Sequence, residues 1–138
     1  MTTVQAVEQA LYDWAPRELA ESWDNVGLLV GDPDAQVGRI LVALDITPAV
    51  VQEAADTGCQ LIVAHHPVMN CAWHQVQTLR TDDLQGKVLM ELVRHNIAAI
   101  CMHTNLDAAE GGVNDVLART LGLEDLEMLT EEKIGRVG

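Results

Sequence analysis

Two adjacent histidines stand at the end of a short apolar segment. His65 and His66 follow residues 61–64 (Leu-Ile-Val-Ala) and precede a proline, so a strand-like segment leads to two imidazoles and then leaves the sheet. A second apolar segment, residues 97–102, is followed closely by Asp107. Neutral imidazole is the commonest protein metal ligand near neutral pH, and His/Asp sites hold zinc, manganese or iron. Two strands that deliver His65, His66 and Asp107 to one edge of a sheet would form a divalent-metal site.

Each of these side chains also has a plain structural interpretation. Neighbouring residues of a regular strand point to opposite faces, so His65 and His66 would serve two ions, about 3.5–4 Å apart and sharing a hydroxide. Alternatively, one histidine is a satisfied core residue and the other caps the loop. His103 and Asp45 are weaker candidates for positions around the ligands. His103 could orient Asp107 or hydrogen-bond the loop, and we expect Asp45 to cap a helix.

Other chemistry-bearing residues carry weaker signals. Gly111-Gly112 before a helix could cradle a phosphate, although a tight turn is the usual meaning of two glycines. His74 and His95 have no supporting neighbours, and no hydroxyl or thiol stands with a suitable base. The three cysteines form no CxxC pair, and we expect them to be small buried hydrophobes: Cys59, Cys71 and Cys101.

The elements that would position the site follow from the apolar pattern. Continuous apolar runs are typical of strands buried on both faces of a parallel sheet. The predicted strands are residues 28–30, 40–44, 60–64 and 97–102. The predicted helices are residues 4–14, a helix opened by Thr47-Pro48 and ended by Gly58, residues 84–94 and residues 113–121. This order predicts one α/β domain over residues 1–138, with a three-layer α/β/α architecture and a mostly parallel sheet.

The candidate residues share one place in this fold. Helical crossovers make the strands parallel, so their carboxyl ends lie along one edge, where open α/β sheets bind ligands. The residues at or just after these ends are Asp45, His65, His66, His103 and Asp107. Their coincidence strengthens the prediction of a site beyond what any single residue supports.

The composition limits the partners. The chain has 21 acidic and 8 basic residues, a net charge of −13 and no cluster of Lys or Arg, which argues against a nucleic-acid partner. An acidic surface mildly favours divalent cations over free anions. The apolar runs are too short to span a membrane, and the N-terminus lacks a signal-peptide pattern. We therefore expect a cytoplasmic protein with no membrane partner.

Five segments, in this order, resemble one family. They are Trp23-Asp24-Asn25-Val26-Gly27-Leu28, Leu44-Asp45-Ile46-Thr47, His65-His66-Pro67, His103-Thr104-Asn105-Leu106-Asp107 and Gly111-Gly112-Val113-Asn114. From its first helix to its last residue, the chain resembles the N-terminal half of the GTP cyclohydrolase 1 type 2 homologues, also called interacting-factor-three-like proteins.

The resemblance implies a toroidal hexamer of α/β subunits with two divalent metals per subunit, and hence a homo-oligomer. The metal ligands that it implies are His65, His66 and Asp107. Our first hypothesis is a metal-dependent hydrolase that acts on a nucleotide-like or other phosphate-bearing small molecule. The alternative is a metal-binding assembly or regulatory protein without turnover.

The sequence departs from the family pattern in two places. Family members supply a further His and Glu, spaced HxxxE, from a second half, whereas no histidine follows His103 here. We expect either a fragment or shortened form, or a partner chain that supplies these ligands. With three ligands, the chain would bind metal loosely, and we expect it to be found empty or with one ion rather than two. Residues 68–71 are also more polar than is usual in the family, which would change the pocket wall.

Overall fold

The computed structural model describes residues 1–72, 75–131 and 134–138, and His74 lies outside them. The helices are α1 (Val4–Trp14), the 3-10 turn η1 (Arg17–Leu19), α2 (Pro48–Thr57), α3 (Leu84–Arg94), α4 (Thr104–Ala108) and α5 (Val113–Thr120). The strands are β1 (Thr2–Thr3), β2 (Gly27–Val30), β3 (Gln36–Val37), β4 (Ile40–Ala43), β5 (Leu61–Ala64), β6 (Ala98–Cys101), β7 (Glu127–Met128) and β8 (Arg136–Val137). All the predicted helices and central strands are present. No helix in these ranges is both long and apolar enough to cross a membrane.

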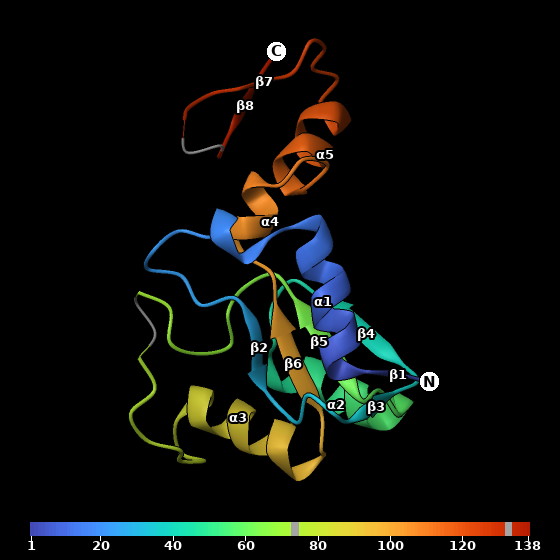
Figure 1. Ribbon diagram of the computed structural model, residues 1–138. Helices are drawn as coiled ribbons and strands as arrows, with labels where there is room; N and C mark the ends of the chain where they lie inside the picture. The colour runs from blue at the N-terminus through green and yellow to red at the C-terminus, as the bar shows by residue number, and fades with distance from the viewer. Residues whose placement is uncertain (73–74, 132–133) are drawn as a thin grey trace.

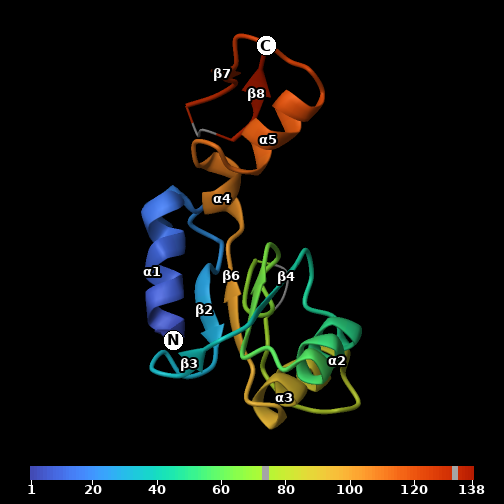
Figure 2. The same cartoon turned by 90° about the vertical axis from the view of Figure 1, so that its right-hand side faces the viewer.

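The central sheet has four strands in the order β2-β6-β5-β4 (Figure 1). Strands β4, β5 and β6 run parallel, as predicted, and β2 runs antiparallel to β6 at one edge. Helices α2 and α3 pack on one face and α1 packs on the other (Figure 2). The predicted three-layer arrangement is therefore confirmed. Because the parallel strands end together, the residues that follow β5 and β6 meet at one edge.

Local sequence explains where the helices of the sheet begin. The side chains of Thr3, Thr47 and Asp83 each accept a backbone N–H bond and so cap α1, α2 and α3. Gly58 ends α2 in the left-handed conformation, with φ of 69°. These signals set the length of α2 and thereby return the chain to form β5 beside β4.

The prediction that every central strand is buried on both faces is wrong for the edge strand β4. Its apolar run predicts burial on both faces, which holds for β6 but not for β4. Ile40 and Val42 are 42% and 77% exposed. The register pairs them with Leu61 and Val63, which pack on the α1 side of the sheet. Because β4 is the edge strand, α1 leaves this part of the face uncovered, and continuous apolarity does not report burial there.

The cysteines are part of the core. Cys59, Cys71 and Cys101 are all buried, which confirms the prediction that they act as small hydrophobes. Burial raises the pKa of the Cys101 thiol to about 12, so this side chain remains protonated at neutral pH.

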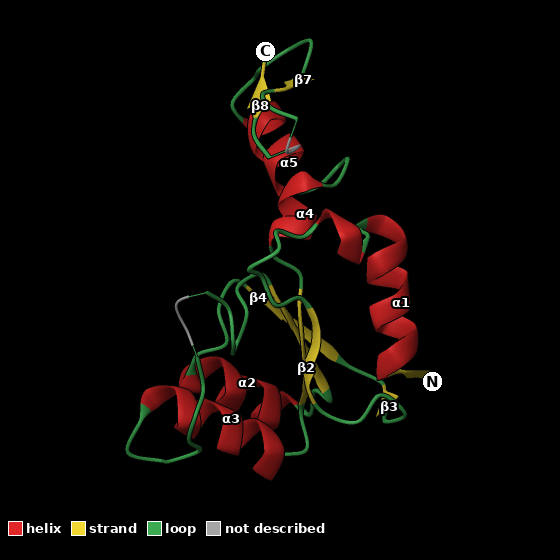
Figure 3. Ribbon diagram, turned by 60° about the vertical axis from the view of Figure 1, so that its left-hand side comes forward, coloured by secondary structure: helices red, strands yellow, loops and turns green. Residues whose placement is uncertain are grey.

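The C-terminal segment, with α4, α5 and the β7–β8 hairpin, extends from the end of the sheet (Figure 3). Gly112 lies so close to α4 that a Cβ atom there would be 1.9 Å from the carbonyl oxygen of Leu106. The N–H of Gly111 donates to Asp115 at 2.6 Å. The glycine pair therefore makes a tight turn, and a carboxylate occupies the N–H that a phosphate would need.

Candidate metal centre

Three histidines meet at the carboxyl ends of β5 and β6. His65 and His66 directly follow β5, and His103 comes shortly after β6. One ring nitrogen from each histidine lies within 4.8 Å of those from the other two. The ring centroids of His65 and His66 are 5.0 Å apart, so the two side chains do not point to opposite faces as residues inside a strand would. The reason is that β5 ends at Ala64, and the alternation of strand side chains ends with it.

A buried carboxylate holds His103. Asp24, on the loop between η1 and β2, lies 2.9 Å from His103 Nδ1, and its side chain is fully buried. Burial alone would raise the pKa of Asp24, but hydrogen bonds from Thr104, His103 and the backbone outweigh it and hold the pKa below its ordinary value. A charged carboxylate only accepts hydrogen bonds, so His103 Nδ1 is the donor. His103 is thus bound to Asp24 rather than to Asp107.

An exposed carboxylate holds His66. Asp45 Oδ1 lies 2.7 Å from His66 Nδ1, and about half of each side chain is exposed. The expectation that Asp45 caps a helix is wrong, because Thr47 caps α2. Asp45 lies instead beside a candidate ligand, where its carboxylate can orient the ring.

His65 faces the remaining carboxylate. Its Nε2 atom lies 3.5 Å from Asp107 Oδ1, and both side chains are mostly buried. Burial lowers the pKa of His65, and the nearby Asp107 carboxylate opposes this shift in part. Its Nδ1 atom is buried and has no hydrogen-bond partner among the described residues. The lowered pKa favours the neutral imidazole, which is the form that binds metals.

A cavity of about 420 Å³ opens beside the cluster. His66, His103 and Asp45 contribute to its lining, and apolar side chains form much of the rest. These include Val68, Cys71, Leu84 and Val88. A volume of this size is typical of small-molecule sites in proteins.

The donor set fits a divalent metal ion. Imidazole nitrogens with one carboxylate are the groups that zinc, manganese and iron accept. Two of the three rings carry a carboxylate on Nδ1, and metal-binding histidines are oriented by partners of this kind. The three histidines thus form a group that could hold a metal ion.

The sequence profile of one family matches almost the whole chain. It describes Duf34/NIF3 (NGG1p interacting factor 3), and the match covers residues 2–138. The chain belongs to the DUF34/NIF3 family. This family member is 39% identical over 125 residues to a Halalkalibacterium halodurans protein named GTP cyclohydrolase 1 type 2 homolog, covering 91% of this chain and 33% of that protein. A Clostridium perfringens protein of the same name is 39% identical over 131 residues, covering 91% and 49%.

Solved structures of similar proteins share the fold. Staphylococcus aureus protein SA1388 superposes with a TM-score of 0.86 at 39% identity, over 93% of this chain and 36% of that one. Reduced HcgD from Methanocaldococcus jannaschii superposes with a TM-score of 0.89 at 30% identity, over 99% and 54%. This DUF34/NIF3 chain thus spans about a third to a half of the length of these relatives. The family resemblance of the five motifs is confirmed.

Sequence reasoning places the three histidines, Asp107 and Asp45 at one edge, and the structure brings them together. Sequence reasoning does not identify Asp24 as a residue of the site, because Asp24 lies 79 residues from His103 along the chain. The available signal was the Trp23-Asp24-Asn25 motif itself, which contributed to the family resemblance without a role for its carboxylate.

Proposed function

We propose that this DUF34/NIF3 chain binds divalent metal at the histidine cluster and hydrolyses a nucleotide-like or other phosphate-bearing small molecule. The observation that carries the proposal is the meeting of three imidazoles at one sheet edge, with one ring nitrogen of each within 4.8 Å of the others. A bound divalent metal supplies an activated water near neutral pH. The name of the curated relatives, GTP cyclohydrolase 1 type 2 homolog, is compatible with a nucleotide-like substrate.

The residues of the chain would hold and surround the ion. Asp45 and Asp24 fix the rings of His66 and His103, which keeps their second nitrogens in a set direction. Asp107, next to His65, would add a carboxylate oxygen to the ligands. The neighbouring cavity would receive the substrate against a wall of apolar side chains.

The number of ions and the assembly belong to the same proposal. His65 and His66 would bind separate ions, with Asp107 beside His65 as a ligand of one of them, so a complete family site would hold up to two ions. The family resemblance suggests a homo-oligomer, with a hexameric ring as its form. Light scattering on the purified chain tests this point, and a strict monomer at all concentrations would contradict it.

A metal-binding assembly or regulatory protein without turnover is the second candidate. Asp24, Asp45 and Asp107 each face a histidine. Among the described carboxylates of the cluster, none is therefore left unengaged to act as a general base. Binding without catalysis would be compatible with this arrangement.

Metal binding is the first test. Calorimetric titration with Zn²⁺ or Mn²⁺ should show weak binding that saturates at a stoichiometric ratio, and His66→Ala should lose most of it. His95→Ala is the matched control, because His95 lies at the end of α3 beside Glu91 and outside the cluster. A chain that binds no stoichiometric divalent ion would refute the proposal.

Turnover separates the two candidates. Phosphate release or ring opening is measured over a panel of nucleotides and phosphoesters, with and without the metal. Metal-dependent turnover that His66→Ala abolishes supports the hydrolase. Stoichiometric metal binding with no turnover across the panel supports the binding protein.

A further inference from the structure

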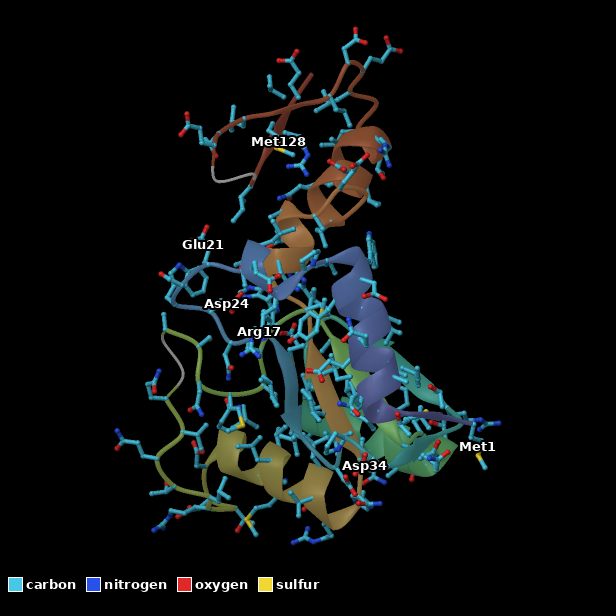
Figure 4. All side chains as sticks on the ribbon, in the orientation of Figure 1. Met1, Arg17, Glu21, Asp24, Asp34 and Met128 are labelled. Carbon is cyan, nitrogen blue, oxygen red and sulfur yellow. The ribbon has the colours of Figure 1, made fainter. Side chains whose placement is uncertain are left out.

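The loop between η1 and β2 contacts both loops that carry the histidines. Asp24 contacts His103, while Nδ2 of the neighbouring Asn25 donates to the carbonyl oxygen of Met69 at 2.9 Å, just beyond His66. Figure 4 shows Asp24 at the end of the sheet, close to the start of α4. Two consecutive side chains of one loop thus join the two halves of the histidine cluster.

The Asp24 carboxylate is fully engaged. Its Oδ1 accepts from His103 Nδ1 at 2.9 Å and from the N–H of Asn25 at 2.8 Å. Its Oδ2 accepts from Thr104 twice, from the N–H at 3.0 Å and from Oγ1 at 2.5 Å. A buried carboxylate is costly unless its oxygens are hydrogen-bonded, and four donors meet that need. These four hydrogen bonds fix the orientation of the Asp24 carboxylate.

This arrangement decides which nitrogen of His103 is available. Because Asp24 accepts at all four contacts, His103 Nδ1 carries a proton, and Nε2 is the nitrogen whose lone pair can bind a metal. His65 and His66 are the rings that lie nearest, with centroids 5.1 Å and 5.5 Å from that of His103. We propose that Asp24 is a positioning residue that makes His103 a third histidine ligand of the metal. The inference rests on the proposed metal site.

A purely structural role for Asp24 is the competing explanation. Asp24 also anchors Thr104, the first residue of α4, so its loss would disturb the loop even if His103 had no part in metal binding. The two explanations differ in what Asp24→Asn does. An amide has one oxygen to accept and one NH₂ group that can only donate.

In Asp24→Asn, an amide oxygen in the place of Oδ2 keeps both bonds from Thr104, and the NH₂ group takes the place of Oδ1 and gives up only the bond from the adjacent Asn25 N–H. This NH₂ group then faces His103 Nδ1, which must become an acceptor, and the ring proton moves to Nε2. The lone pair that would bind the metal is lost without any loss of side-chain volume. A structural anchor alone would not change the tautomer of His103 in this way.

The experiment combines two measurements on the chain and its variants. Nitrogen-15 NMR of the metal-free protein reports the His103 tautomer, and competition titration with Zn²⁺ reports affinity. We expect Nδ1–H in the natural chain and Nε2–H in Asp24→Asn, with Zn²⁺ affinity about 10–100-fold lower. Asp45→Asn is the matched control and should leave the His103 tautomer unchanged.

A double-mutant cycle shows whether Asp24 acts through His103. In a His103→Ala background, Asp24→Asn should cause no further loss of Zn²⁺ affinity, although it still affects stability. Equal losses in both backgrounds, or an unchanged tautomer in Asp24→Asn, would overturn the role of Asp24 and leave the metal site standing. If the natural chain binds no Zn²⁺, the proposed function and this inference both fail. If His103→Ala binds Zn²⁺ normally, only the inference fails.

Discussion

The histidine cluster contains two histidine–carboxylate pairs of similar length in different surroundings. His103 and Asp24 are joined at 2.9 Å with side chains 10% and 0% exposed, whereas His66 and Asp45 are joined at 2.7 Å with side chains 46% and 53% exposed. Water can replace a partner lost from an exposed hydrogen bond but not one lost from a buried bond. The comparison teaches that the burial of the carboxylate, more than the length of its bond to histidine, determines how much it contributes to the stability of the fold.

The largest effect should come from truncating the buried carboxylate. Asp24→Ala leaves donors of His103 and Thr104 unpaired in the interior, and we expect the free energy of unfolding to fall by about 3–5 kcal/mol. Asp45→Ala should change it by no more than about 0.5 kcal/mol. Urea unfolding followed by circular dichroism measures both. Similar losses for the two variants would break the comparison.

The second largest effect should be the contribution of Asp24 to the loss of stability in acid. The folded-state pKa of Asp24 lies below its ordinary value, so its ionised form stabilises the fold above about pH 4. This stabilisation is lost as the pH falls through the lowered folded-state pKa. Asp24→Asn cannot ionise, so its stability should fall less steeply over this acid range than that of the natural chain. Urea unfolding at a series of pH values tests this, and parallel curves would contradict it.

The exposed pair should matter for metal affinity more than for stability. Asp45→Ala frees the His66 ring to rotate, and we expect Zn²⁺ affinity to fall by about tenfold, or about 1.4 kcal/mol. This lies at the lower end of such effects because water can take over the bond to His66 Nδ1. Competition titration measures the change. A loss of a hundredfold or more would show that exposure does not weaken a partner's influence.

The sequence predicts the fold well where local signals punctuate it. Thr47, Pro48 and Gly58 mark the ends of α2, and the apolar runs locate β5 and β6. It fails at the edges of the sheet, because the antiparallel direction of β2 and the exposure of Val42 depend on which elements cover them. Those are long-range properties that no short pattern reports.

The site follows the same rule. The positions of His65 and His66 could be predicted because they directly follow β5, and that of Asp107 because it lies in α4, the short helix that comes after β6. The pairing of His103 with Asp24 joins residues 79 positions apart, and no spacing rule links them. Strand alternation describes residues inside β5 and not those after it, so it does not fix how the rings of His65 and His66 lie relative to each other.

A histidine–carboxylate pair outside the cluster supplies the smallest expected effect. His95 Nε2 lies 3.5 Å from Glu91 at the C-terminal end of α3, with both side chains partly exposed. His95→Ala keeps the backbone bond from residue 95 to the carbonyl oxygen of Glu91, so the free energy of unfolding should change by less than about 0.5 kcal/mol. Because His95 lies outside the histidine cluster, Zn²⁺ affinity should change by less than about twofold. The same unfolding and competition titrations measure both quantities. If His95→Ala weakened Zn²⁺ binding as much as Asp45→Ala does, the hydrogen bond from Asp45 to His66 would not explain the effect of Asp45→Ala on Zn²⁺ affinity.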